Sequence, residues 1–255
     1  MSARLGYDVT GDPDAPVVVL GSSLGTTRAM WDPQLTALAQ RFRVIRFDHR
    51  GHGESELPPA PYRIGELGRD VLDLLDSLGV EHFAYAGLSL GGMVGMWIGS
   101  EAPDRVRQLC LLCTSAALES PDAWHERAAT VRAGGLAAIT DRVTGRWFTP
   151  GFAAERPDVV TSYRRMLGAT AVEGYAGCCE AIAVMDLRDR LAAITAPTLA
   201  IAAADDLAIP PAHLASIVAS VAGARLCLVE PAAHLANVER PERITTLLLE
   251  HFEGD

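Results

Sequence analysis

The stretch Gly87-Leu88-Ser89-Leu90-Gly91 constrains the fold more than any other part of the chain. An apolar, β-favouring run at 82–86 precedes it, and an apolar, small-residue segment at 92–99 that resembles a buried helix follows it. Strand, Gly-x-Ser-x-Gly and helix in this order are the context of a nucleophile elbow. The turn is so tight that both flanking residues are glycine. We therefore expect a strained Ser89 whose hydroxyl stands clear of a sheet, above the N-terminus of a helix.

Strand and helix patterns alternate along most of the chain. We expect an edge strand at 4–10 and further strands at 16–20, 42–48, 82–86, 106–113, 197–202 and 224–229. Helical spacing of apolar residues predicts helices at 30–39, 64–78, 92–99, 213–221 and 242–251. Such alternation predicts an α/β fold with a mostly parallel central sheet and helices on both faces.

The alternation stops between about 114 and 194, where the sequence looks helical or irregular and no strand is expected. A helical block inside a sheet fold is naturally a lid over the carboxyl ends of the strands, where open α/β sheets bind ligands. We therefore predict a core domain of residues 1–116 and 190–255, with residues 117–189 inserted as a helical lid.

Composition narrows the class of protein. The 255 residues are 49% hydrophobic and 21% charged, as in a globular protein, and one α/β domain with an insertion fits this length. The formal net charge is −10, and all 22 basic residues are arginine. An acidic balance without basic clusters argues against nucleic acid and anionic membranes as partners. Since no apolar run reaches transmembrane length, we expect a cytoplasmic protein, and its oligomeric state stays open.

The five cysteines suggest neither a disulfide framework nor a metal site. Cys110 and Cys113 have the spacing of a redox or zinc pair, but they lie in an apolar run that resembles a buried strand. No second pair or His-x-His motif completes a zinc site. Buried free cysteine behaves as a small hydrophobe, so we expect core packing, no metal and no cofactor.

A serine nucleophile needs a base, and the base needs an acid to orient it. In elbow folds these follow in the order Ser, Asp, His, on loops after later strands. The strand at 197–202 runs into Asp205 and Asp206, and the strand at 224–229 runs into His234. We prefer Asp206 as the acid because its spacing to Pro210 matches the usual acid loop, whereas Asp205 is expected to face solvent. Ser89, Asp206 and His234 are thus the predicted catalytic residues.

An acyl-transfer site also needs N–H donors aimed at the developing oxyanion. One should be the backbone N–H of Leu90, directly after the nucleophile. The other should come from the small-residue loop at 21–27, and we assign it to the Ser23 amide. An ordinary flexible turn is the alternative interpretation of this loop.

Several motifs resemble those of one family. The chain is similar to the α/β-hydrolase fold, and specifically to 3-oxoadipate enol-lactonases, over nearly its whole length. The elbow and the three predicted catalytic residues are typical of the superfamily, whereas the Ser-Leu-Gly-Thr loop with Met-Trp-Asp and the lid motifs indicate the lactonase branch. The matching stretches are 21–26, 30–34, 48–55, 87–92, 146–150, 173–179, 185–188 and 233–239. The family usually has Ser-Asn-Ser where this chain has Gly21-Ser22-Ser23, and glycine in place of Ala203.

The resemblance implies hydrolysis of 3-oxoadipate enol-lactone, a small carboxylate-bearing lactone, in the catabolism of aromatic compounds. The substrate carboxylate should meet an arginine of the lid, since a planar guanidinium suits it. Arg132 and Arg146 are the candidates, although either could be a solvated surface residue. Trp124 and Trp147 could line the pocket or pack within the lid.

Other functions fit the same residues. A carboxylesterase, another lactonase or a cofactor-free C–C hydrolase would share the elbow and the catalytic residues. A ligand-sensing receptor that keeps a hydrolase pocket is the alternative from a different class. An intact Ser89, Asp206 and His234 set argues against loss of catalysis, but it does not exclude sensing.

Overall fold

A seven-stranded sheet forms the centre of the computed structural model, which describes residues 2–118 and 120–254. The strand order is β1-β3-β2-β4-β5-β6-β7; β1 pairs antiparallel with β3 and the other neighbouring pairs are parallel. The mostly parallel sheet expected from the sequence is thereby confirmed. The strands are β1 (Tyr7–Thr10), β2 (Val17–Gly21), β3 (Arg43–Phe47), β4 (Phe83–Leu88), β5 (Val106–Leu112), β6 (Thr198–Ala203) and β7 (Arg225–Val229).

Strand β1 is shorter than the predicted edge strand at 4–10. The backbone of Arg4 bonds instead to Glu56, whose N–H donates to the Arg4 carbonyl at 3.0 Å and whose carboxylate accepts from the Arg4 N–H at 2.9 Å. The Gly6 N–H donates to the Ser55 hydroxyl. These bonds join the chain before β1 to the loop after β3, and ladder pairing begins only at Tyr7.

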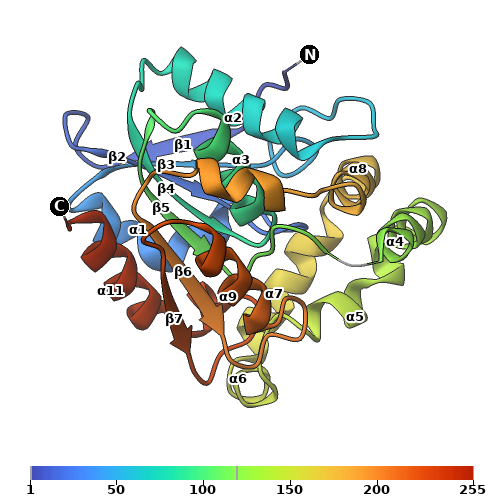
Figure 1. Ribbon diagram of the computed structural model, residues 1–255. Coiled ribbons are helices and arrows are strands. Elements are labelled where there is room, and N and C mark those ends of the chain that lie inside the picture. The colour runs from blue at the N-terminus through green and yellow to red at the C-terminus, as the bar shows by residue number, and fades with distance from the viewer. Residues whose placement is uncertain (1, 119, 255) are drawn as a thin grey trace.

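Helices cover both faces of the sheet (Figure 1). Helices α1 and α11 pack against each other on one face, whereas α2, α3 and α9 lie on the other. The structure also contains α10, one turn that the sequence pattern did not predict. These helices are α1 (Asp32–Ala39), α2 (Ile64–Ser77), α3 (Leu90–Glu101), α9 (Pro211–Ser220), α10 (Ala236–Glu239) and α11 (Pro241–Phe252), and the 3-10 segments η1 (Arg28–Trp31) and η3 (Arg188–Ala193) accompany them.

The segment between β5 and β6 forms helices that gather on one side of the sheet (Figure 1). They are α4 (Pro121–Gly134), α5 (Thr140–Thr144), α6 (Pro150–Glu155), α7 (Pro157–Gly168) and α8 (Val172–Ala183), with the 3-10 turn η2 (Leu136–Ala138) after α4. An isolated antiparallel bridge between Ala117 and Asp186 joins the two ends of this segment. We call residues 121–183 the helical insertion.

The insertion contacts the core through glycine backbones. An added Cβ on Gly174 of α8 would lie 2.2 Å from the Gly51 carbonyl oxygen, in the loop after β3. The backbones of α8 and of this loop therefore lie too close together for any residue other than glycine at position 174.

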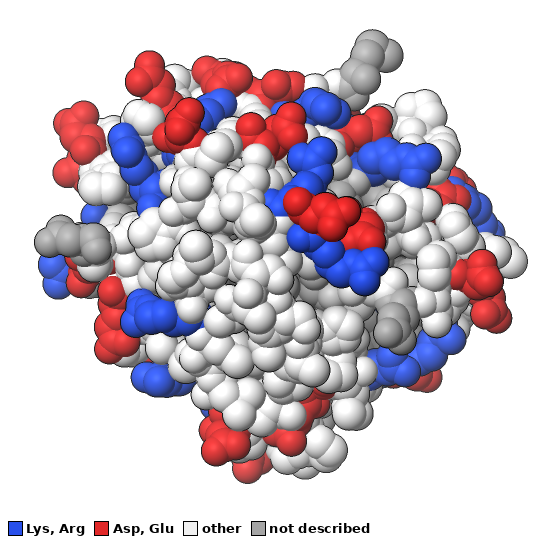
Figure 2. Space-filling model, in the orientation of Figure 1, with Lys and Arg blue, Asp and Glu red and all other residues white. Residues whose placement is uncertain are grey.

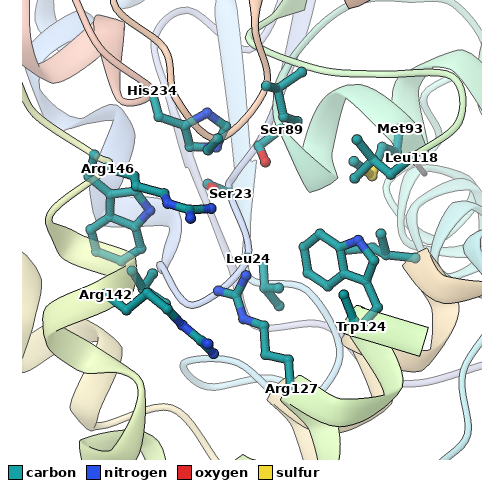
Figure 3. Close-up of a pocket in the computed structure, with 16 residues that line it drawn as sticks. Ser23, Leu24, Ser89, Met93, Leu118, Trp124, Arg127, Arg142, Arg146 and His234 are labelled. Carbon is teal, nitrogen blue, oxygen red and sulfur yellow. The ribbon is translucent and has the colours of Figure 1, made fainter. Parts of the chain in front are cut away.

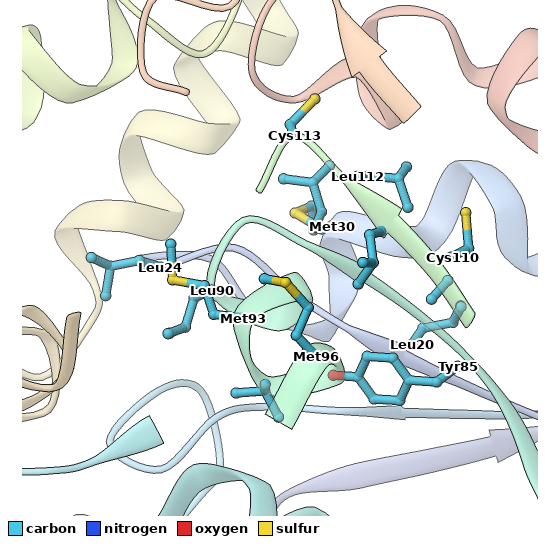
Figure 4. Close-up of a cluster of buried hydrophobic side chains, with 14 of the residues drawn as sticks. Leu20, Leu24, Met30, Tyr85, Leu90, Met93, Met96, Cys110, Leu112 and Cys113 are labelled. Carbon is cyan, nitrogen blue, oxygen red and sulfur yellow. The ribbon is translucent and has the colours of Figure 1, made fainter. Parts of the chain in front are cut away.

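Apolar side chains of the sheet and of the helices around it make the core, and Figure 4 shows the part of this cluster around α3. The apolar face predicted for 64–78 is buried in α2, except that Leu78 lies half-exposed just beyond the helix. Cys110 and Cys113 are free and fully buried within the apolar cluster of Figure 4, as expected of core cysteines. Burial raises the pKa of both thiols, which therefore stay protonated.

Charged side chains surround an uncharged area on one surface of the molecule (Figure 2). This area lies over α9 and the neighbouring strands, and α9 contains no charged residue. Within the described ranges, no helix is both long enough and apolar enough to cross a membrane.

Candidate active site

Ser89 occupies the turn between β4 and α3 in a strained conformation. Its φ of 56° and ψ of −115° lie in a region that non-glycine residues rarely adopt. The Ser89 N–H donates to the Leu112 carbonyl at 2.9 Å, and the Ser89 carbonyl accepts from the Thr114 hydroxyl at 2.7 Å. Both backbone groups are thus bonded at the end of β5, which holds the strained turn in place.

The flanking glycines are required by backbone contacts on both sides of the turn. An added Cβ on Gly87 would lie 2.2 Å from the Gly91 carbonyl oxygen, and one on Gly91 would lie 2.2 Å from the Gly21 carbonyl oxygen. Real Cβ atoms do not approach so closely, so the elbow packs directly on the end of β2.

His234 and Asp206 are joined by a short hydrogen bond. Nδ1 of His234 lies 2.8 Å from Oδ2 of Asp206, and both side chains are buried. The other carboxylate oxygen of Asp206 accepts from the N–H groups of Ala208 and Ile209 at 2.8 and 2.9 Å. Because an ionised carboxylate only accepts, Nδ1 carries the proton and Nε2 is left as the basic nitrogen. Asp205, the alternative acid, is exposed and accepts from the Ala232 N–H.

Ser89 and His234 line the same cavity, of about 350 Å³, between the sheet and the helical insertion. Figure 3 shows the imidazole and the hydroxyl at the same end of this cavity. In the described part of the chain, the Ser89 hydroxyl and the His234 imidazole form no direct hydrogen bond. The distance between nucleophile and base is often longer in a site without a ligand. The sequence-predicted base and nucleophile are therefore brought together, although not within bonding distance.

The two predicted oxyanion donors lie at the same end of the cavity. Leu90 is the first residue of α3, and Ser23 follows β2 and lines the cavity beside Ser89. Neither N–H donates a hydrogen bond to another group in the described part of the chain. Both amides are therefore free to bind an oxygen atom.

Two histidines that the sequence interpretation left without a role hold the loop around Ser23. Nε2 of His49 lies 2.9 Å from the Ser22 carbonyl, to which it donates. Nε2 of His52 accepts from the Gly25 N–H at 3.0 Å. Burial lowers the pKa of both imidazoles, that of His49 to about 3. The His-x-x-His spacing after a strand was the only sequence signal for this role. The groups that the two histidines bind lie more than twenty residues earlier in the chain, so the sequence pattern did not reveal them.

Arginine dominates the wall of the cavity that the insertion supplies. Arg127, Arg142 and Arg146 line it, and no aspartate or glutamate of the described residues does so. Trp124 and Trp147 also line the cavity, as one interpretation of the sequence expected. The wall can attract an anion, although the molecule as a whole is acidic.

Arg132 does not reach this cavity, which corrects its candidacy as a substrate ligand. It is exposed on α4 and forms ion pairs with Glu173 at 3.0 Å and Glu180 of α8. Arg127 was missed, although its spacing of three from Trp124 places both residues on one helix face. Arg142 was also missed, although it lies only four residues before Arg146, which the sequence analysis named as a candidate.

No group of three or more His, Cys, Asp or Glu side chains in the described ranges is arranged to hold a metal ion. The cavity instead combines a serine, a carboxylate-bound imidazole, two free amides and a cationic wall. This set of groups is suited to acyl transfer.

The fold and this site define an α/β hydrolase. A model of the alpha/beta hydrolase fold family matches residues 16–241, so the chain belongs to this family. Its resemblance to 3-oxoadipate enol-lactonases is confirmed: the chain is 38% identical to 3-oxoadipate enol-lactonase 2 of Acinetobacter baylyi, over 93% of this chain and 89% of that protein.

A solved structure shares the fold of this chain, and a relative with a different name is also similar in sequence. The crystal structure of the enol-lactonase from Burkholderia xenovorans LB400 superposes with a TM-score of 0.97 at 38% identity, over 99% of this chain and 97% of that one. A putative carbamate hydrolase RutD of Azorhizobium caulinodans is 32% identical over 97% of this chain and 94% of that protein.

Proposed function

We propose that the protein is a serine hydrolase that opens 3-oxoadipate enol-lactone to 3-oxoadipate. The observation that carries this proposal is one cavity in which Ser89 and the Asp206-bound His234 face a wall of arginines. Such a cavity suits a small ester that bears a carboxylate, and relatives named as enol-lactonases support the lactone. We also propose that this reaction belongs to the catabolism of aromatic compounds in the cytoplasm, as the resemblance to enol-lactonases implies.

In the proposed acylation step, Nε2 of His234 accepts the proton of the Ser89 hydroxyl while Oγ bonds to the lactone carbonyl carbon. The carbonyl oxygen becomes an oxyanion that accepts from the Ser23 and Leu90 amides. When the oxyanion collapses, the ring C–O bond breaks and the enol oxygen leaves. His234 returns its proton to this oxygen, and the enol tautomerises to the ketone.

In the proposed deacylation step, His234 takes a proton from water, whose oxygen bonds to the acyl carbon. The bond to Oγ then breaks, and Ser89 recovers its proton from His234. The sum is one lactone and one water converted to one keto acid. Asp206 keeps Nδ1 protonated and stabilises the imidazolium in both steps.

Residues 117–189 act in this proposal as a lid over a core of residues 1–116 and 190–255. The insertion supplies the arginine wall, whereas the core supplies the reacting groups. Substrate therefore reacts at the boundary between the two, where water can be limited.

The direct test is the loss of the enol-lactone's ultraviolet absorbance with purified protein, measured beside a panel of neutral esters, other lactones and carbamates. We expect the enol-lactone to have the highest kcat/KM. Neutral esters that exceed it by orders of magnitude would replace this proposal with a carboxylesterase. Saturable lactone binding without turnover would indicate a receptor.

Carbamate hydrolysis is the second candidate, because relatives named as putative carbamate hydrolases align over nearly the whole chain. The cationic wall favours the larger, carboxylate-bearing lactone. A carbamate turned over faster than the lactone would reverse this preference.

A further inference from the structure

Arg127 is the arginine of the cavity wall that the structure holds most firmly. Its guanidinium carbon lies 5.0 Å from the ring centre of Trp124 and 5.3 Å from that of Tyr175. One terminal nitrogen also donates a hydrogen bond to the Tyr175 hydroxyl. Two aromatic rings and one neutral hydroxyl therefore fix the cation without neutralising it.

The charge of Arg127 has no carboxylate partner in the described part of the chain. Its Nε is buried and makes no hydrogen bond there. Arg132, five residues later on the same helix, is paired with two glutamates of α8. A partly buried guanidinium at a cavity wall, fixed but unneutralised, is an efficient site for an external carboxylate.

The other two arginines of the wall are less well prepared. Arg142 and Arg146 are exposed, and neither side chain makes a hydrogen bond or ion pair with the described residues. Figure 3 shows Arg127 reaching from α4 toward Leu24, whereas Arg142 turns away from Ser89. Binding through either would have to order a free side chain, a cost that the packed Arg127 avoids.

Tyr175 connects this arginine to the loop that carries Ser23. Its ring is fully buried on α8, and an added Cβ on Gly25 would lie 3.0 Å from its Cε2. Burial raises the pKa of its hydroxyl, so the neutral phenol persists. The contact with Gly25 fixes the ring, and the hydroxyl fixes Arg127.

We propose that Arg127 binds the carboxylate of the substrate and that Tyr175 is the positioning residue that holds its guanidinium in the cavity. This deepens the proposed function and rests on it for the identity of the substrate. The carboxylate subsite itself can be probed without the lactone.

The experiment compares Arg127→Gln, Arg127→Lys and Tyr175→Phe with Arg165→Gln as the charge-matched control. Arg165 is exposed on α7, outside the cavity. Kinetics are measured on the enol-lactone and on p-nitrophenyl acetate, a neutral ester, with adipate as an unreactive carboxylate inhibitor of ester hydrolysis. Thermal unfolding is recorded for each variant.

We expect Arg127→Gln to raise KM for the lactone about 10- to 100-fold, with a much smaller change in kcat, and to weaken adipate inhibition by a similar factor. Arg127→Lys should be intermediate, because it keeps the charge but loses the planar fork. Tyr175→Phe should raise KM about 3- to 10-fold without lowering kcat in proportion. Arg165→Gln should match the wild type.

Three results would overturn the proposal. The first is an equal loss of kcat/KM on the lactone and on the neutral ester in the Arg127 variants. The second is unchanged adipate inhibition in these variants. The third is a larger rise in KM for the lactone in Arg142→Gln or Arg146→Gln than in Arg127→Gln. If the wild type fails to open the lactone but adipate inhibition still depends on Arg127, the proposed function fails and the carboxylate subsite stands.

Discussion

The backbone N–H of Gly25 donates a hydrogen bond of 3.0 Å to Nε2 of His52, which joins the loop after β2 to the loop after β3. Nε2 can accept this bond only when it carries no proton. Nδ1 of His52 lies 3.2 Å from the Arg50 carbonyl and is therefore the protonated nitrogen. The loop that positions Ser23 thus depends on a neutral, buried imidazole.

This dependence predicts acid sensitivity. Burial lowers the pKa of His52 and His49 below the unfolded value of about 6.5. Their stabilising effect is complete above that pH and is lost as pH falls toward their folded pKa values, because the unfolded chain then binds more protons. Each can lower the free energy of unfolding by up to about 1.4 kcal/mol per pH unit in this range.

Urea unfolding between pH 7.5 and 5 measures this effect. His52→Gln keeps an oxygen that can accept from Gly25, so its free energy of unfolding should fall less steeply with acid than that of the wild type. An equally steep fall of the free energy of unfolding with pH in the two proteins would contradict the role of His52.

Replacing the acid should separate the two neighbouring aspartates. Asp206→Asn removes the group that keeps Nδ1 of His234 protonated, so we expect kcat to fall about 10⁴-fold with little change in KM. Asp205→Asn is the matched control, because Asp205 is exposed and its carboxylate bonds only to a backbone N–H among the described residues. Steady-state kinetics on any accepted ester suffice, and equal losses in both variants would contradict the assignment.

Tyr85 explains why glycine fits at position 21. An added Cβ on Gly21 would lie 2.2 Å from the Tyr85 hydroxyl, which donates to the Gly91 carbonyl at 3.0 Å. Gly21→Ala should destabilise the protein by about 1–3 kcal/mol through overpacking. Tyr85→Phe removes the clashing oxygen, so the double variant should be more stable than the sum of the single effects predicts. A double-mutant cycle based on urea unfolding measures this coupling. Additive changes in the free energy of unfolding would contradict it.

The contact of α8 with the core predicts contrasting effects for two helical glycines. Gly174→Ala places a methyl against the Gly51 backbone and should destabilise the fold by about 1–3 kcal/mol. Gly168→Ala meets nothing within 4 Å at the end of α7 and should be neutral or stabilising by up to about 1 kcal/mol. Thermal unfolding of both variants is the measurement, and a similar loss in both would contradict the close packing.

The sequence predicts the parts of this molecule that local pattern determines. The strand runs, the apolar face of α2 and the elbow around Ser89 agree with the structure, because each depends on residues close together in the chain. The wall of the cavity could not be predicted equally well. Helix α4 has no strong apolar stripe, so its orientation depends on packing against α8, about fifty residues later. The sequence analysis therefore proposed Arg132 as a substrate ligand, whereas Arg127 faces the cavity. The bonds of His49 and His52 were missed for the same reason.

The contrast between an arginine-lined cavity and a molecule with 32 acidic and 22 basic residues has a kinetic consequence. Electrostatic interactions across solvent are screened beyond about 8 Å at physiological ionic strength, whereas contacts inside a cavity are screened much less. Dissolved salt therefore weakens the long-range repulsion of an anionic ligand before it weakens the attraction at the wall. Capture of such a ligand should be fastest at moderate ionic strength, rather than in the most dilute buffer.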